Sequence, residues 1–445
     1  FVISAARGGQ DVTNPRFAHQ GWARTHSSGA RLRRLAPWDV LKLKRLSMRS
    51  SVTLVALCTL LVSACGGEPQ QADLDDSART ATVASEGTID FQAVADALLR
   101  QLDLQPGERV LLVGVPGRFD GLIGPLRDGI MRAGAEDLGA FAADGASQPS
   151  WETDFVEELH EAREEQLESI LQDVDAALML PGTNVGHRVY AAMQNVLKGG
   201  RGRTVHFHWL GAYDINGAER NVDAMIDGFY QRILATTDYT ALAATQLAFE
   251  EAMRGSTVHV TTPAGSDISF QIGDRPVTKQ DGNASAARAA LGRNLIDREV
   301  ELPAGAIRVA PIEGSVNGRV VFPPSVWGEE ATEGLTLEFV QGVMTSLSAT
   351  TGADGARAEI EEAGPAGRAF REFALGFNPL LAIPTEGERW IPYYGYGAGV
   401  VRLSLGDNTE LGGNVGGGYV RWNFFVDATV EVGGVVWVDG GRLIR

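Results

Sequence analysis

The spacing of apolar residues predicts helices that alternate with buried strands in the first part of the folded chain. Apolar positions recur at helical spacing over residues 91–104, and residues 109–115 then form a short continuous apolar run, which is typical of a buried parallel strand. A helical pattern follows over residues 122–133. Similar apolar runs return at residues 174–180 and 205–210. This order predicts an α/β domain over residues 89–238, with a parallel sheet covered by helices.

The pattern changes from residue 239 onward. Runs rich in β-branched and aromatic residues alternate there with frequent glycines, as is typical of strands joined by tight turns. The predicted strands cover residues 257–262, 268–272, 319–322, 335–340, 399–405 and 419–426. We therefore expect a second, α+β domain over residues 239–445 that is largely antiparallel.

Residues 151–174 are rich in acidic residues, and four apolar residues recur among them at helical spacing. These are Phe155, Leu159, Leu167 and Leu171. The pattern predicts a helix with one buried stripe and a solvated acidic face. His160, Glu161 and Glu164 lie in this segment and are only a faint match to a zinc-binding helix, so we interpret them as part of the exposed face.

Residues 48–65 have the features of a bacterial lipoprotein signal peptide. The segment starts with Met-Arg-Ser-Ser, continues with an almost entirely apolar run over residues 52–62 and ends in Ser-Ala-Cys. This run is shorter than the roughly 20 helical residues that span a bilayer, and small residues precede the cleavage position. Cys65 is therefore the predicted lipidated residue of a protein that is exported and anchored at the cell envelope, in the periplasm or at the outer membrane. A buried helix with an incidental cysteine is the alternative.

The segments on either side of this signal are not expected to fold. Residues 1–47 are rich in arginine and show no sustained periodicity, so we interpret them as upstream sequence outside the mature protein. Residues 66–88 contain few large apolar side chains and cannot bury enough surface to fold, so they form a predicted tether. Both cysteines, Cys58 and Cys65, lie in the signal segment, and no disulfide framework is expected in the folded part.

The charge of the chain is unevenly distributed. The formal net charge is -17, but residues 1–64 contain ten of the 39 basic residues and only two of the 56 acidic ones, which leaves 29 basic and 54 acidic residues in the remainder. Such an acidic surface repels phosphate backbones and anionic headgroups. Nucleic acid is therefore not an expected partner, and the membrane is expected to be contacted through the lipid anchor only.

Seven short landmarks follow one another in the second domain, and their order is more specific than any one of them. They are TPAGSDISF at 262–270, DG at 281–282, LPAGAIRVAP at 302–311, EFALGFNP at 372–379, GVVRLSLGD at 399–407, GGN at 412–414 and RWN at 421–423. In this order they resemble the metallo-aminopeptidases of the aminopeptidase T/S type, and LQPGERVLL at 104–112 is similar to the first domain of that family. The resemblance implies an aminopeptidase T-like second domain and a homodimer. Iron-dependent dihydroxypyridine dioxygenases share this fold, so the fold alone does not fix the chemistry.

The resemblance also implies which positions to inspect for a metal centre. Aminopeptidases of this family hold two divalent metals, such as zinc or cobalt, through two glutamates, two histidines, a tyrosine and an aspartate. The matching positions here are Ala306, Glu372, Arg402, Thr409, Arg421 and Asn423. Only Glu372 keeps the family's residue, and a guanidinium group has no acceptor atom with which to ligate a cation. We therefore expect no metal cofactor.

The two arginines at these positions have two interpretations, and both place Arg402 and Arg421 close together. In the first, Arg402, Arg421, Glu372 and Asn423 form a structural cluster that fills a disused pocket, because buried cations need partners. In the second, the same four residues bind a carboxylate or phosphate through forked hydrogen bonds. Aromatic residues that could line such a pocket are Trp390, Tyr393, Tyr394, Tyr396 and Trp422.

Another candidate pair, His206 and His208, alternates with apolar residues on a predicted strand, so the two imidazoles share one face and could share a metal. No third ligand is near in sequence, and a structural pair is the favoured interpretation.

The leading functional hypothesis is a lipid-anchored, non-catalytic protein that binds an anionic small molecule or a peptide terminus. The alternatives are an active aminopeptidase that releases N-terminal residues from peptides, and an assembly protein that offers an interaction surface.

Overall fold

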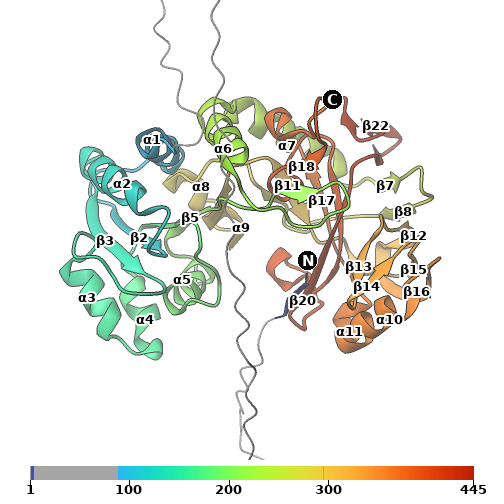
Figure 1. Cartoon of the computed structure of the whole chain (residues 1–445), viewed down its shortest axis with the longest axis horizontal. Helices are drawn as coiled ribbons and strands as arrows, with labels where there is room; N and C mark the ends of the chain where they lie inside the picture. The colour runs from blue at the N-terminus through green and yellow to red at the C-terminus, as the bar shows by residue number, and fades with distance from the viewer. Residues whose placement is uncertain (1, 5–88, 294) are drawn as a thin grey trace, which may run out of the picture. The chain divides into compact units, whose positions relative to one another are not determined.

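The computed structural model of the chain describes residues 2–4, 89–293 and 295–445, which belong to one compact unit (Figure 1). The predicted signal peptide, the lipidated Cys65 and the predicted tether lie outside the described residues, as does the upstream segment apart from Val2–Ser4. Among the described residues, no helix is both long enough and apolar enough to cross a membrane.

The first part of the unit is an α/β layer structure, as the apolar runs predict. Its sheet has the strand order β10-β5-β4-β2-β3, and every pairing is parallel. The strands are β2 (Arg109–Gly114), β3 (Glu136–Ala142), β4 (Ala176–Met179), β5 (Arg203–Phe207) and β10 (Glu299–Leu302). The helices are α1 (Phe91–Leu102), α2 (Asp120–Arg132), α3 (Asp154–Glu161), α4 (Glu164–Leu171), α5 (Arg188–Lys198) and α6 (Ala224–Thr236).

Alternate residues of the central strand β2 enter two different hydrophobic cores. Val110 and Leu112 pack with apolar residues of α1, α2 and α6, whereas Leu111 and Val113 pack with those of α3, α4 and α5. Successive side chains of a strand point to opposite faces, so the two helix groups cover the two faces of the sheet. This arrangement explains why the strand reads as a continuous apolar run.

The acidic segment predicted as one helix consists of two. Helix α3 ends at Glu161, Ala162 has an extended backbone with φ -68° and ψ 142°, and α4 begins at Glu164. Leu159 and Leu167 are buried, which agrees with the predicted apolar stripe. His160 stacks on Phe141 with the ring centroids 4.5 Å apart rather than joining a metal site.

The second part of the unit is built on two antiparallel sheets and the helices α7 (Tyr239–Met253), α10 (Ala353–Glu362) and α11 (Gly364–Gly367). The six-stranded sheet has the order β1-β20-β19-β17-β11-β9, with β1 (Val2–Ser4), β20 (Tyr419–Phe425), β19 (Val401–Gly406), β17 (Phe370–Gly376), β11 (Ala306–Val309) and β9 (Thr278–Lys279). The eight-stranded sheet has the order β16-β15-β12-β8-β7-β21-β22-β23, with β16 (Val343–Ser348), β15 (Thr336–Val340), β12 (Asn317–Val321), β8 (Asp267–Phe270), β7 (Val258–Thr261), β21 (Thr429–Val432), β22 (Val435–Asp439) and β23 (Arg442–Leu443). The predicted α+β class of the second domain is confirmed.

One short stretch of chain links the two parts. Strand β10 comes from the second half of the sequence but pairs in parallel with β5, so it completes the first sheet. Only three residues separate the end of β10 from the start of β11, which belongs to the six-stranded antiparallel sheet. Residues 299–309 therefore connect the parallel sheet directly to the six-stranded antiparallel sheet, and side chains from both sheets can meet beside this segment.

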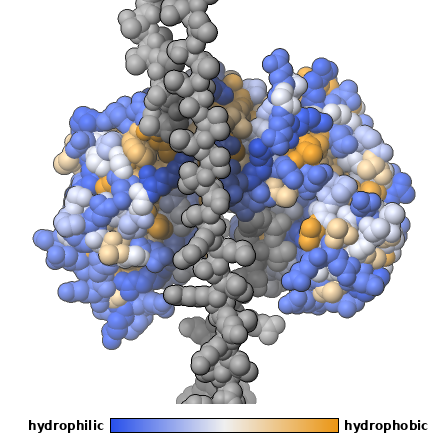
Figure 2. All heavy atoms as spheres, in the orientation of Figure 1, coloured by the Kyte–Doolittle hydropathy of each residue, from blue (hydrophilic) through white to orange (hydrophobic). Residues whose placement is uncertain are grey.

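The face of the molecule in Figure 2 is mostly hydrophilic, with hydrophobic residues in small separate patches.

Candidate functional site

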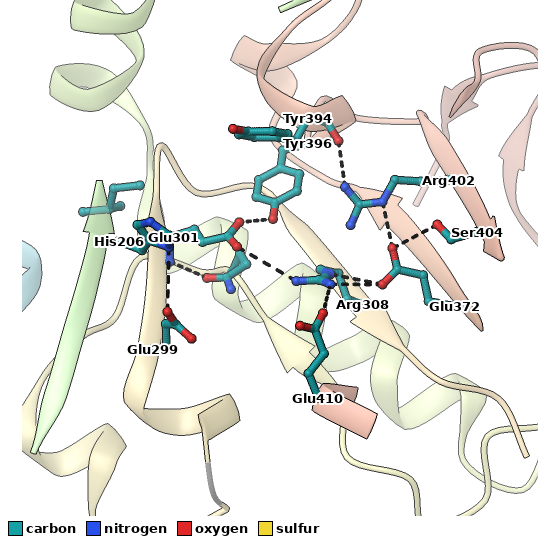
Figure 3. A network of polar contacts seen from close by, with 12 residues as sticks. His206, Glu299, Glu301, Arg308, Glu372, Tyr394, Tyr396, Arg402, Ser404 and Glu410 are labelled. Carbon is teal, nitrogen blue, oxygen red and sulfur yellow. Dashed lines mark hydrogen bonds and ion pairs between the residues drawn. The ribbon is translucent and has the colours of Figure 1, made fainter. Parts of the chain in front are cut away.

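Glu372 lies at the centre of a buried cluster of ion pairs (Figure 3). It belongs to β17, and its side chain is fully buried. Arg308 Nη2 donates to Glu372 Oε2 at 3.1 Å, and Arg402 Nε donates to Oε1 at 2.9 Å. Ser404 Oγ donates to Oε1 at 3.2 Å, and an Nη atom of Arg371 donates to Oε2. One carboxylate is therefore shared by three guanidinium groups and a hydroxyl.

Strand register brings four of these residues to one face of the six-stranded sheet. Arg308 on β11 lies opposite Ala374 on β17, and Ala374 lies opposite Arg402 on β19. Glu372, two residues before Ala374, lies opposite Ser404. Residues that are directly opposite one another on neighbouring strands, or two apart on one strand, share a face.

Arg371 reaches the cluster through a local irregularity. The register between β17 and β19 shifts between Phe370 and Glu372, which leaves Arg371 without a partner on β19. Such a β-bulge bends the strand and can redirect a side chain. Arg371 is 2% exposed; it contacts Glu372, and its Nε donates to the carbonyl oxygen of Asp407 at 2.6 Å. Regular alternation would have placed Arg371 on the opposite face from Glu372.

Glu410 closes the cluster on its solvent side. It lies in the short helix η4 (Thr409–Leu411), and its side chain is 49% exposed, whereas those of Arg308 and Arg371 are 11% and 2% exposed. Arg308 Nη2 donates to Glu410 Oε1 at 2.6 Å, and Arg371 Nη2 donates to the same oxygen. Glu410 is therefore the accessible partner of two buried cations.

A small cavity of about 50 Å³ borders this side of the cluster. Its lining residues are Thr278, Gln280, Leu295, Glu299, Glu301, Arg308, Glu410 and Leu411. Glu301 Oε1 lies 3.9 Å from Arg308 Nη1, and the Tyr396 hydroxyl donates to Glu301. The cavity has room for a few water molecules or one small group, whereas pockets for drug-sized ligands have about 300–1,000 Å³.

Two carboxylates of this region, the buried Glu372 and the half-buried Glu299, have opposite pKa shifts. Burial disfavours the charged form of Glu372, but Arg308, Arg371 and Arg402 outweigh it and hold the pKa of Glu372 well below its ordinary value. Glu299 forms no ion pair with an arginine within the part of the chain that the structure describes. Burial raises the pKa of Glu299 to about 7, against the opposing effect of its hydrogen bonds from Gln194 and Tyr190.

Glu299 belongs to a polar group that includes the predicted histidine pair. The Tyr190 hydroxyl donates to Glu299 Oε1 at 3.0 Å and lies 2.7 Å from His206 Nδ1. His206 and His208 share one face, as predicted, and their ring centroids are 3.7 Å apart. Burial lowers the pKa of both histidines, and the neighbouring His208 lowers that of His206 further. Their contacts support the structural interpretation of the pair.

The prediction that Arg402 and Arg421 lie close together is wrong. Arg421 Nη1 donates to both carboxylate oxygens of Glu359 on α10, at 2.8 and 3.0 Å. Its guanidinium group lies over the Trp327 ring at 3.4 Å from the centroid. Arg402 instead lies over Trp422, 4.6 Å from the ring centroid.

The register of β19 and β20 gives the reason. Arg402 is directly opposite Phe424, whereas Arg421 and Asn423 are opposite Leu405 and Leu403. Alternate residues of a strand point to opposite faces, so Arg421 and Asn423 project from the face that Glu372 does not use. Of the four predicted ligand-binding residues, Arg402 and Glu372 meet, and the other two do not.

The two remaining family positions differ as well. Ala306 lies on the cluster's face of β11, two residues before Arg308, but offers no polar atom. Thr409 is not part of the cluster: its Oγ1 donates to Asp407 at 2.6 Å, and its neighbour Glu410 makes the ion pairs instead.

The aromatic residues predicted to line a pocket have separate roles. Tyr396 donates to Glu301, the carbonyl oxygen of Tyr394 accepts from Arg402 Nη1 at 3.3 Å, and Trp422 lies beneath Arg402. Trp390 and Tyr393 belong to the hydrophobic core. Arg402 Nη2 and Trp422 Nε1 are buried and have no hydrogen-bond partner among the described residues.

The residues around Glu372 do not fit a two-metal centre. Three guanidinium groups occupy its surroundings, and none of them has a lone pair for a metal. Within residues 89–293 and 295–445, no group of three or more histidines, cysteines, aspartates or glutamates is placed to hold a metal ion.

Comparison with known proteins identifies the fold. 2,5-Dihydroxypyridine dioxygenase from Pseudomonas putida matches with a TM-score of 0.53 and 16% identity, over 80% of this chain and 97% of that chain. AmpT (aminopeptidase T) from Thermus thermophilus matches with a TM-score of 0.53 and 15% identity, over 80% of this chain and 99% of that chain. No family model and no curated protein matches the sequence. The chain therefore has a distant structural relationship to the aminopeptidase T fold, with a parallel α/β part and largely antiparallel sheets.

Proposed function

We propose that this chain is a non-catalytic protein built on the aminopeptidase T fold, and that it binds an anionic small molecule or a peptide terminus near Glu372. The observation that carries the proposal is the ring of Arg308, Arg371 and Arg402 around one buried carboxylate. A peptidase of the type that this chain resembles needs divalent metals to activate water and polarise the scissile carbonyl. The resemblance gives Glu372 and Arg402 to two of its metal-ligand positions, and Arg308 and Arg371 add two further cations beside them. Arginine supplies positive charge but cannot generate a metal-bound nucleophile.

Two buried hydrogen-bond donors support the binding role. Arg402 Nη2 and Trp422 Nε1 have no acceptor among the described residues, and a buried donor without a partner costs about 1–3 kcal/mol. An acceptor oxygen from a bound anion or a water molecule would satisfy them. Arginine pairs with carboxylate and phosphate groups through charge-assisted hydrogen bonds, so an anion is the expected ligand.

The proposal predicts that the protein binds no stoichiometric metal and releases no amino acids from peptides. Purified chain is incubated with zinc, cobalt or manganese, dialysed and analysed for metal content, and the same samples are assayed with a panel of peptides. We expect substoichiometric metal and no turnover above buffer. One or two metal ions per chain together with release of N-terminal residues would support the alternative function, an active aminopeptidase.

We also propose that Cys65 carries a lipid that anchors the protein at the cell envelope, because a short apolar segment and small residues precede it. Cells expressing the chain from Met48 onward are labelled with an alkyne fatty acid. We expect label on the wild type, none on Cys65→Ala, and normal labelling of the matched control Cys58→Ala. Labelling that survives in Cys65→Ala, or an unlabelled wild type, would contradict the anchor.

A further inference from the structure

The exposure of Glu410 differs sharply from that of its partners. Its side chain is 49% exposed, yet it accepts hydrogen bonds from Arg308 and Arg371, whose side chains are 11% and 2% exposed. An exposed ion pair between two flexible side chains contributes little. Here both donors are fixed in the core, because each also holds the buried Glu372. The two arginines therefore present a preformed anion-binding face to solvent, and Glu410 covers it.

The charges of the cluster leave room for one anion at that face. Without Glu410, three arginines face two carboxylates, Glu372 and Glu301. Glu299 also lines the cavity, and with Glu410 in place burial raises its pKa to about 7. Buried cations require compensation, so a single carboxylate at the position of Glu410 balances the group.

The hydrogen bonds and the space around Glu410 fit a small carboxylate. Both arginines donate to Oε1 of Glu410, and within the described residues no hydrogen bond reaches its Oε2. Glu410 and Arg308 also line the cavity of about 50 Å³. If the Glu410 side chain swings out, the vacated volume joins this cavity and accommodates a group of similar size. Paired arginines recognise planar carboxylates well.

We propose that Arg308 and Arg371 form a binding site for the carboxylate group of a small molecule, and that Glu410 is an internal competitor that occupies the site until the ligand displaces it. The inference rests on the proposed function, since it names the ligand class and the position within the same cluster. It also explains how two buried cations stay compensated when no ligand is present.

The experiment removes the Glu410 carboxylate by mutation and supplies small carboxylates in solution. Thermal unfolding of Glu410→Ala is followed at constant ionic strength in chloride, acetate, propionate or inorganic phosphate. We expect Glu410→Ala to unfold at a lower temperature than wild type in chloride. Acetate or propionate should restore the Tm in a saturable way, with half-maximal effect on the order of 1 mM, which four or five non-hydrogen atoms can supply.

Two variants serve as matched controls. Glu410→Gln keeps the size of the side chain, so it fills the site and its Tm should not respond to acetate. Glu313→Ala removes a partly buried glutamate that pairs with the single arginine Arg275, and no saturable response is expected there. Wild type, in which Glu410 competes, should respond at least tenfold more weakly than Glu410→Ala.

The outcomes separate this inference from the proposed function. Equal responses of Glu410→Ala and Glu410→Gln, a response to phosphate but not to acetate, or a non-saturable effect of all anions would overturn the carboxylate site. If Glu410→Ala does not fold, propionate is titrated into wild type and into Arg308→Lys instead. The proposed site predicts weaker binding to Arg308→Lys, and equal binding to the two proteins would overturn it. Metal content and peptide turnover, which test the proposed function, do not enter these measurements.

Discussion

Glu372→Gln is expected to lower the free energy of unfolding by about 3–5 kcal/mol, the range for removing one charged partner from a buried ion pair. The substitution keeps the volume of the side chain but removes the negative charge that Arg308, Arg371 and Arg402 share. Three buried guanidinium groups would then face each other with less compensation. Equilibrium unfolding in urea at pH 7 measures the change.

The pH dependence of this effect follows from the lowered pKa of Glu372. Its pKa in the folded protein lies well below the ordinary value of 4.5, so the contribution of its charge is fully present above pH 4.5 and is lost as the pH falls. The difference between wild type and Glu372→Gln should therefore shrink progressively below that pH. Glu386→Gln, at an exposed glutamate, is the matched control and should change stability by less than about 0.5 kcal/mol. A loss of that same small size in Glu372→Gln would show that the cluster does not depend on its central carboxylate.

The sequence predicts the layers of the fold better than the pairing of its strands. The apolar run at 109–115 becomes β2 because both faces of that strand are covered, and no long-range information is needed to recognise it. Strand β10 is different. Residues Glu299–Leu302 alternate between charged and apolar side chains, which predicts a strand but does not reveal that its partner, β5, lies about 100 residues earlier.

The site shows the same division between local and long-range information. Arg308 could have been found, because it lies two residues after Ala306 on one strand and therefore on the same face. Arg371 could not, because a β-bulge brings it to the side of Glu372. Glu410 reaches the cluster from a loop whose geometry has no periodic pattern.

The wrong prediction that Arg421 lies close to Arg402 has a further cause. An ordered set of landmarks fixes the position of a residue along the chain, but it does not fix the face of the sheet to which the side chain points. A difference of one residue in register moves every side chain of a strand to the other face. In β20 this rule places Trp422 beside Arg402, and it places Arg421 against Glu359.

Glu299→Gln is expected to stabilise the protein at pH 8, in contrast to the loss expected at Glu372. Burial raises the pKa of Glu299 from 4.5 to about 7, so the folded protein holds this proton more tightly than the unfolded chain does. The stabilising effect of the neutral form is fully present below pH 4.5 and is lost as the pH rises through about 7. The charged carboxylate then costs up to about 3 kcal/mol, which the neutral amide avoids while it still accepts a hydrogen bond from Tyr190.

Urea unfolding of wild type and of Glu299→Gln at pH 5, 6, 7 and 8 tests this expectation. We expect the two proteins to differ least at pH 5 and to diverge in favour of the variant up to about pH 7. Above that pH Glu299 is ionised in the folded protein as well, so the difference should level off. Glu386→Gln again serves as the control, because Glu386 is exposed, and its profile should be parallel to that of wild type. Parallel profiles for Glu299→Gln would mean that Glu299 is already charged at pH 5, and that the polar group around Tyr190 and His206 compensates its burial in full.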